Sequence, residues 1–129
     1  MYTFALKEIE EIKGRLKIYK LLVDGECSFD KFEKEIEKEG NLKSELTTIQ
    51  TRLYEIADGK SLPETKFKDI TPKNGSNKEY EIKTHHLRIY LFHEKKTGRI
   101  IVCGGKKGTQ KEDIRHFRKI KKEYFNQKP

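Results

Sequence analysis

Alternating hydrophobic and polar residues mark two stretches near the start of the chain, Tyr2–Leu6 and Leu16–Val23, on either side of a charged run. Such alternation is typical of half-buried strands, so residues 1–24 are predicted to form strands, most simply a β-hairpin. A helix through Ile9 and Ile12 is the alternative interpretation of the same segment.

Two helices joined by a short turn are predicted over residues 28–59. The first begins after Ser28 and stops at Gly40, and the second ends before Gly59. Their apolar positions recur at helical spacing: Phe29, Phe32 and Ile36, then Leu42, Leu46, Ile49, Leu53 and Ile56. A helix-turn-helix DNA reader is a competing interpretation, but residues 28–59 carry five basic and eight acidic side chains, which phosphate would repel. The pair is therefore predicted to cover a sheet.

Strand-like alternation returns over residues 80–106, in the stretches Tyr80–Thr84, Leu87–His93 and Arg99–Cys103. A five-residue connection before Arg99 has the length and composition of a hairpin loop, so an antiparallel meander is expected. A flexible loop, residues 71–77, precedes the meander.

A last helix is predicted over residues 110–125. Thr109 and Glu112 match the capping-box pattern at its start. Its apolar side consists of Ile114, Phe117, Ile120 and Tyr124. The elements together predict one domain, residues 1–129, of the α+β class: a twisted antiparallel sheet with the helix pair on one face and a basic C-terminal helix.

Successive side chains of a strand point to opposite faces of a sheet, which separates the meander residues into two sets. One set, predicted to face the core, is Tyr80, Ile82, Leu87, Ile89 and Leu91. The other set is charged and aromatic: Glu79, Glu81, Lys83, Arg88, Tyr90 and Phe92. This second face is expected to be exposed to solvent and cationic.

The charge of the chain is concentrated in its last third. Residues 83–129 hold 14 Lys and Arg against four Asp and Glu, whereas residues 1–82 hold 15 against 17, for a net charge of +8. A one-sided excess of this kind is typical of a surface that binds a polyanion. The alternative is a basic surface that only keeps the protein in solution.

Cysteine usage and hydropathy restrict the classes of protein. Cys27 and Cys103 have no C-x-x-C spacing, and no stretch approaches the length of an uncharged membrane span. The N-terminus lacks the apolar region of a signal peptide, so a cytoplasmic protein that does not bind membranes is expected. No histidine pair has the H-x-x-x-H spacing of a helical zinc site, and no acidic cluster indicates a magnesium site, so no metal or cofactor is expected.

Cleavage of RNA by its own 2′-hydroxyl needs a base, cations for the developing charge on phosphorus, and an acid for the leaving oxygen. The basic residues at the strand ends, Lys83, Arg88, Lys106 and Lys107, meet the electrostatic need, and Glu81 or His86 is a candidate for proton transfer. Tyr90 is a candidate for base stacking. Further RNA contacts are expected from the last helix: Lys111, Arg115, Arg118, Lys119 and Lys122. The alternative for Arg88 and Lys83 is an exposed ion pair with Glu81.

Four segments, in this order, resemble the RelE/HigB-like toxins of bacterial type II toxin–antitoxin systems, particularly the phage-derived HigB-like branch. They are Glu79–Lys83, Leu87–Phe92, Arg99–Val102 and Lys106–Lys111, and with the helix pair the resemblance covers residues 16–125. Two departures stand out, Gly104-Gly105 in place of an aromatic residue and Glu112 in place of proline. Additional N-terminal residues precede the family's first strand, where they would add an edge strand or a partner surface.

The resemblance implies a RelE-like α+β fold and an mRNA endonuclease that acts on the ribosome and is neutralised by a cognate antitoxin, in a toxin–antitoxin hetero-oligomer. It implies that Arg88 stabilises the phosphate, that Lys83 occupies a basic position of the site, and that Lys106 and Lys107 match the family's paired lysines. Tyr124 matches a functional C-terminal tyrosine of some relatives and is a third candidate for proton transfer.

The leading hypothesis is therefore a metal-independent mRNA interferase that cleaves translated mRNA. The alternative is a catalytically inactive RNA- or protein-binding module of the same fold, for example a toxin that inhibits gyrase by binding.

Overall fold

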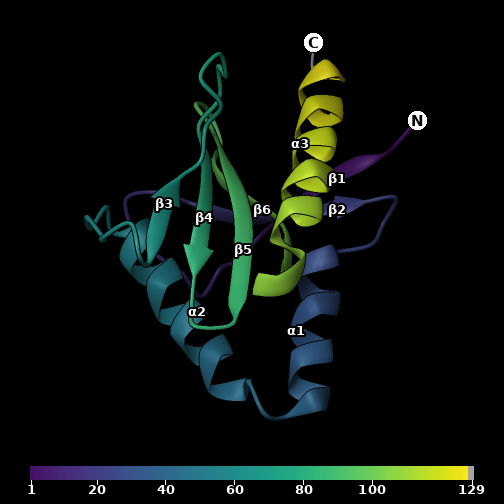
Figure 1. Ribbon diagram of the computed structural model, residues 1–129. Coiled ribbons are helices and arrows are strands. Elements are labelled where there is room, and N and C mark those ends of the chain that lie inside the picture. Colours follow the sequence, from purple (N-terminus) through teal and green to yellow (C-terminus); the bar gives the residue numbers. More distant parts are fainter. Residues whose placement is uncertain (128–129) are drawn as a thin grey trace.

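A six-stranded sheet lies between a pair of helices, α1 and α2, and a third helix, α3, in the computed structural model, which describes residues 1–127 (Figure 1). The elements in chain order are β1 (Phe4–Glu8), β2 (Ile18–Val23), α1 (Ser28–Glu39), α2 (Lys43–Ala57), β3 (Phe67–Asp69), β4 (Glu79–Lys83), β5 (Leu87–Glu94), β6 (Gly98–Lys106), a 3₁₀ turn (Lys107–Thr109) and α3 (Gln110–Asn126). The α+β class is confirmed, with a strand order of β1-β2-β6-β5-β4-β3.

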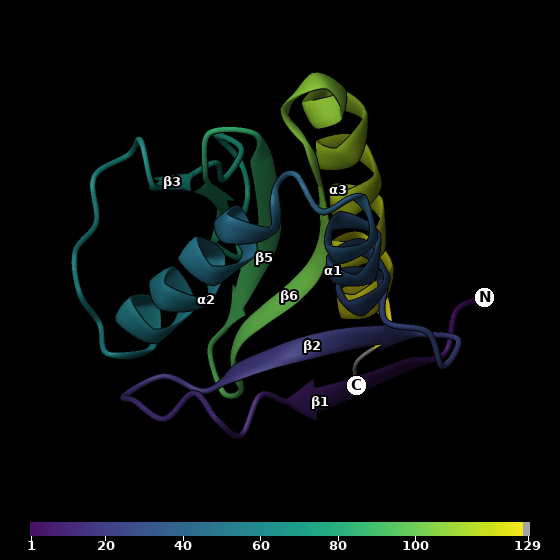
Figure 2. The same cartoon turned by 90° about the horizontal axis from the view of Figure 1, so that it is seen from below.

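The first two strands form the predicted antiparallel hairpin, with Phe4 opposite Val23 and Glu8 opposite Tyr19. Residues 9–12 form a turn between them, so the alternative of an N-terminal helix is wrong. Figure 2 shows β1 and β2 side by side along one edge of the sheet, with β6 leading away from β2. The N-terminal residues therefore add an edge strand, β1.

The expectation of a purely antiparallel sheet is wrong, because β2 and β6 are parallel, with Ile18 opposite Arg99. After β2 the chain forms α1, α2 and the strands β3, β4 and β5, and only then does β6 pair with β2. A long connection that contains helices is what parallel neighbours require. The sequence pattern also missed β3, whose three residues are too few for an alternating pattern to be visible.

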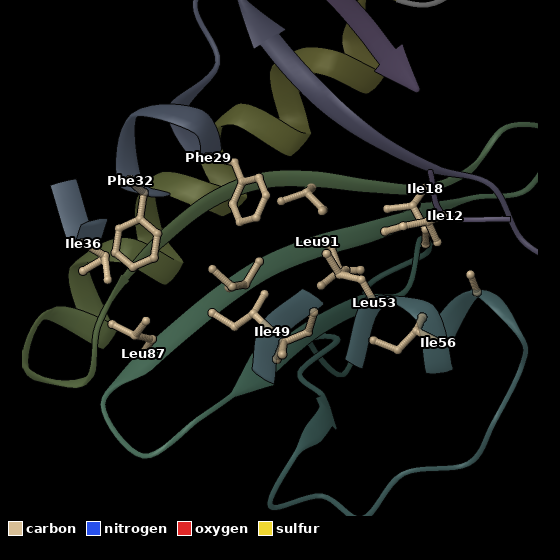
Figure 3. Packing of buried hydrophobic residues seen from close by; sticks show 14 residues of the cluster. Ile12, Ile18, Phe29, Phe32, Ile36, Ile49, Leu53, Ile56, Leu87 and Leu91 are labelled. Atoms are coloured by element: carbon tan, nitrogen blue, oxygen red, sulfur yellow. The ribbon is translucent and has the colours of Figure 1, made fainter. Parts of the chain in front are cut away.

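The helix pair covers one face of the sheet, as expected. Phe29 and Phe32 of α1 and Ile49 and Leu53 of α2 point toward the strands (Figure 3). At the start of α1 the Sγ of Cys27 accepts the backbone N–H of Asp30 at 3.5 Å. At its end Gly40 has a φ of 83°, the left-handed conformation that ends many helices.

The opposite face is covered by α3, so the expectation that this face is exposed is wrong for its central strands. Tyr90 and Phe92 alternate as predicted but are both fully buried. The ring of Phe117 lies 5.8 Å from that of Tyr90, and the ring of Tyr124 lies 5.4 Å from that of Phe92. The apolar side of α3 needs a hydrophobic surface, and the aromatic residues of β5 provide it.

The predicted capping box at the start of α3 is not formed. The hydroxyl of Thr109 donates to the Asp113 carboxylate at 2.7 Å and makes no bond to a backbone N–H of the helix. The preceding 3₁₀ turn brings Thr109 to a ψ of 16°, close to helical, rather than to the extended conformation of a capping residue.

The glycines at the end of β6 allow both helix layers to approach the sheet. A Cβ on Gly104 would lie 2.6 Å from the ring of Phe32 in α1 and 2.8 Å from Ile89, and a Cβ on Gly105 would lie within 2 Å of the Asp113 carboxylate in α3. A larger side chain at Gly104 would therefore clash with the ring of Phe32 and with Ile89.

Gly104→Ala is expected to lower the free energy of unfolding by about 1–3 kcal/mol, because the added methyl group overpacks the contact with Phe32. Gly108→Ala is the matched control, since a Cβ there meets nothing within 4 Å. Urea denaturation of the two variants and the wild type measures the difference. Equal stabilities of the two variants would contradict this packing of α1 on β6.

Candidate functional site

Most of the predicted catalytic residues gather at one end of the sheet. Lys83, the last residue of β4, is directly opposite Arg88 in β5. Lys106, the last residue of β6, is opposite Leu87. The backbone N–H of Lys107 donates to the His86 carbonyl at 2.8 Å. The turn between β4 and β5 and the end of β6 therefore form one basic end of the sheet.

The residues at this end divide between the two faces. Lys83 and Arg88 share strand parity with Glu81, which accepts a hydrogen bond from Gln110 of α3 and so lies on the α3 face. Lys106 belongs to the other face, where its ammonium group binds Glu39 at the end of α1, with 2.8 Å to Oε2. The expected convergence of Lys106 with Lys83 and Arg88 on one surface is therefore wrong.

Arg88 is an unusual residue at this end because its charge is buried without a carboxylate partner. The residue is 7% exposed, and its Nη1 donates to the carbonyls of Thr84 and Leu87 at 2.7 and 2.8 Å. Its Nε is buried and has no hydrogen-bond partner within residues 1–127. The hydrogen bonds of Arg88 go to carbonyl groups, and the residue forms no ion pair with an acid in this part of the chain. Buried charges are normally paired, so Arg88 is a site at which an anion would be stabilised.

The predicted alternative, an exposed ion pair of Glu81 with Arg88 or Lys83, is absent from the described part of the chain. Glu81 is 1% exposed and accepts from the side-chain amide of Gln110 at 2.5 Å. Lys83 is half-buried and forms no ion pair with any residue from 1 to 127. Two cations therefore lie side by side at the strand ends, and neither forms an ion pair within residues 1–127.

Further cations lie on the same α3 face as this pair. Lys68 of β3 is opposite Glu81 and shares its parity, and it is exposed. A surface hollow of about 410 Å³ on α3 is lined by Lys111, Ile114, Arg115 and Arg118. We call Lys68, Lys83, Arg88, Lys111 and Arg115 together the cationic surface. Its charges repel one another, and a bound polyanion would relieve that repulsion.

Arg118 lines the hollow but already has partners. Its Nε donates to Glu79 at 2.9 Å and its Nη2 donates to the carbonyl of Ile70 at 2.7 Å. Lys121, which the sequence analysis missed, donates to the second oxygen of Glu79 at 2.8 Å and to the Asn77 carbonyl at 2.6 Å. The signal in the sequence that could have identified Lys121 is Glu79, because a carboxylate on a buried strand face needs a cationic partner.

The remaining cations of α3, Lys119 and Lys122, are exposed and lie further along the helix toward its C-terminus. They extend the positive charge of α3 beyond the hollow without taking part in it.

His86 is held by a carboxylate of the helix pair. The Oε2 of Glu45 in α2 lies 2.7 Å from the ring Nδ1 of His86, and its Oε1 accepts the His86 backbone N–H at 2.8 Å and the Thr84 hydroxyl. These hydrogen bonds lower the pKa of Glu45 to about 2, against the cost of its partial burial. Because an ionised carboxylate only accepts hydrogen bonds, Nδ1 of His86 is the donor in this contact, and Nε2 is the ring nitrogen that Glu45 does not engage. The side chain of His86 is 53% exposed, so a substrate can reach it.

Three residues predicted for chemistry or stacking lie outside this arrangement. Tyr124 is buried, and its hydroxyl donates to Glu94 at 3.0 Å, at the opposite end of β5 from Arg88. Glu81 is enclosed between β4 and α3, and Tyr90 has no exposed surface, so neither reaches a substrate. Burial and the nearby Glu81 also raise the pKa of the Tyr90 hydroxyl. His86 is the remaining residue of the three candidates for proton transfer.

Histidine, cysteine and carboxylate side chains in residues 1–127 form no group of three that would hold a metal ion. None of the helices described is both long and apolar enough to cross a lipid bilayer. No protein-family model, curated protein or solved structure matches the chain.

Glu45→Gln is expected to lower the free energy of unfolding at pH 7 by about 1–3 kcal/mol, because charge-assisted hydrogen bonds to Thr84 and His86 are lost. The wild-type carboxyl has a pKa near 2 when folded, against 4.5 ordinarily, so its contribution is complete above pH 4.5. The stability difference should shrink as the pH falls from 4.5 toward 2, as measured by urea denaturation at several pH values.

Glu55→Gln, on the same helix, is the control, since no side-chain hydrogen bond to Glu55 occurs in residues 1–127. A stability difference between wild type and Glu45→Gln that is constant over this pH range would refute the assignment.

Proposed function

We propose that the protein binds RNA on the cationic surface and cleaves it as a metal-independent endoribonuclease, in the manner of a RelE/HigB-like toxin. Its substrate would be mRNA under translation on cytoplasmic ribosomes, and a cognate antitoxin would neutralise it. The observation that carries the proposal is Arg88, a buried guanidinium group without a carboxylate partner in residues 1–127, beside Lys83. A phosphate diester supplies the missing negative charge.

The chemistry follows from the groups at this end of the sheet. Nε2 of His86 accepts the proton of the ribose 2′-hydroxyl, and the freed oxygen attacks phosphorus. Arg88 and Lys83 stabilise the negative charge that develops on the phosphate, which is the contribution expected of donors fixed before the reaction. The 5′ oxygen leaves as its bond to phosphorus breaks, and Lys83 is the candidate to protonate it. Lys111 and Arg115 hold the adjoining RNA backbone.

The order of elements is consistent with a RelE-like fold. A strand, a helix pair on one face of the sheet, an antiparallel meander and a basic C-terminal helix follow one another as the resemblance implies. This agreement supports the proposed family, and the site residues are argued from the contacts described above.

A second candidate function is an RNA- or protein-binding module without chemistry. The specific observation in its favour is the division of the basic end between two faces. His86 is held by α2, which lies on the helix-pair face, whereas Lys83 and Arg88 lie on the α3 face. If the His86 ring does not reach the bound phosphate, the cationic surface binds RNA and leaves it intact.

Arg88→Ala and Lys83→Ala are each expected to reduce mRNA cleavage about 10²–10³-fold, because each removes a fixed cation from the transition state. The measurement is mapping of new 5′ ends in bacterial mRNA minutes after induction. Lys95→Ala, an exposed lysine in the β5–β6 turn, is the control. Because Arg88 is buried, circular dichroism must show that the Arg88→Ala variant is folded. Arg88→Lys, which keeps a positive charge at this position, is a second variant for the same measurements. Undiminished cleavage by folded variants would refute this phosphate site.

His86→Ala is expected to reduce cleavage by about 10²-fold or more, as loss of a general base does, while RNA affinity changes little. His116→Ala is the control, because His116 is an exposed histidine on α3 and is not the partner of Glu45. Affinity is measured by fluorescence anisotropy with a labelled RNA. RNA that stays intact with the wild type but binds tightly would establish the binding module instead.

A further inference from the structure

A cavity on the helix-pair face of the sheet is separate from the cationic surface. It measures about 250 Å³ and lies between α1, α2, the turn after β1 and the strand β2. Five hydrophobic side chains line it: Ile9, Ile12, Phe29, Ile49 and Leu53. Figure 3 shows three of these contributors, Ile12, Phe29 and Leu53, coming from three different segments of the chain. Small-molecule sites typically combine such an apolar lining with a few polar groups.

A second hollow of about 470 Å³ lies next to the cavity, at the edge of the sheet. The two share Ile9, Glu11 and Lys20, and residues 6–10 line the rest of the second hollow. Acids dominate the charged lining of the pair, with four glutamates, Glu8, Glu10, Glu11 and Glu33, against two lysines, Lys7 and Lys20. This local acidity contrasts with the net charge of +8 of the chain.

Lys20 does not neutralise these acids fully, because it already has a partner. Its ammonium group lies 2.6 Å from the Asp30 carboxylate and 5.8 Å from the centre of the Phe29 ring. Glu33 is half-buried, and among the described residues neither it nor Glu11 has a hydrogen bond or an ion pair. Burial raises the pKa of Glu33, with Asp30 and Glu37 adding to the rise and Lys20 opposing it. A cation placed at the mouth of the cavity would relieve this cost.

We infer that this cavity binds a small organic ammonium compound with one hydrophobic group, whose cation pairs with Glu33 and Glu11 and whose hydrophobic group lies against Phe29 and Leu53. A neutral ligand of the same shape would leave the carboxylate without a partner, and an anion would be repelled. The cavity is smaller than most drug-binding sites, which limits the ligand to a single ring or a short branched chain. The inference does not depend on the proposed nuclease activity.

The test is titration of the ¹⁵N-labelled full chain with 2-phenylethylamine, followed by NMR. Saturable shifts are expected at the amides of Ile9, Phe29 and Leu53. The neutral analogue 2-phenylethanol should bind at least about tenfold more weakly, because it makes no charge-assisted contact. Glu33→Gln should reduce the affinity for the amine to that for the alcohol.

Glu35→Gln is the matched control, since Glu35 is exposed on the same helix and does not line the cavity. Thermal melting verifies that both variants fold. The inference is overturned if the amine and the alcohol bind equally, if Glu35→Gln loses as much affinity as Glu33→Gln, or if no saturable shift occurs at these amides.

Discussion

The packing of α3 on the sheet face that carries Tyr90 and Phe92 is the constraint on which the rest of the arrangement depends. The aromatic side chains of β5 and α3 exclude water from the centre of this face. Glu79 and Glu81 of β4 are consequently buried beside these aromatic side chains and need hydrogen-bond partners from α3. Glu79 accepts from Arg118 and Lys121, and Glu81 accepts from Gln110. Arg88, near the start of α3, is also buried, but within residues 1–127 it forms no ion pair with an acid.

The two faces of the sheet differ in electrostatics as well as in cover. The cationic surface lies on the α3 face, at the end of the sheet where β4 meets β5. The acidic cavity lies on the other face, near the N-terminal hairpin, and neither Glu33 nor Glu11 has an ion pair among the described residues. The two sides of the sheet therefore differ in the sign of the charge that each would attract from solution.

Much of the fold could be predicted from local patterns, because each pattern concerns neighbours in sequence. The first helix stops at Gly40 and the second ends before Gly59, as predicted. The division of the β4 and β5 side chains between the two faces of the sheet was also predicted correctly. What failed depends on neighbours in space. Whether Tyr90 is exposed depends on where α3 packs, and no residue near Tyr90 in the sequence carries that information. The partner of His86, Glu45, comes from a different helix, and a single sequence gives no distance between them.

The parallel pairing of β2 with β6 also determines when the sheet can be completed. Ile18 is opposite Arg99, so the N-terminal hairpin has no neighbour in the sheet until β6 has been synthesised. Contacts this distant in sequence slow folding, and the waiting hairpin exposes an unpaired strand edge meanwhile. Helix α3 follows β6 in the chain, covers the second face and provides Lys111 and Arg115. A nascent chain that has not yet formed α3 therefore lacks part of the cationic surface.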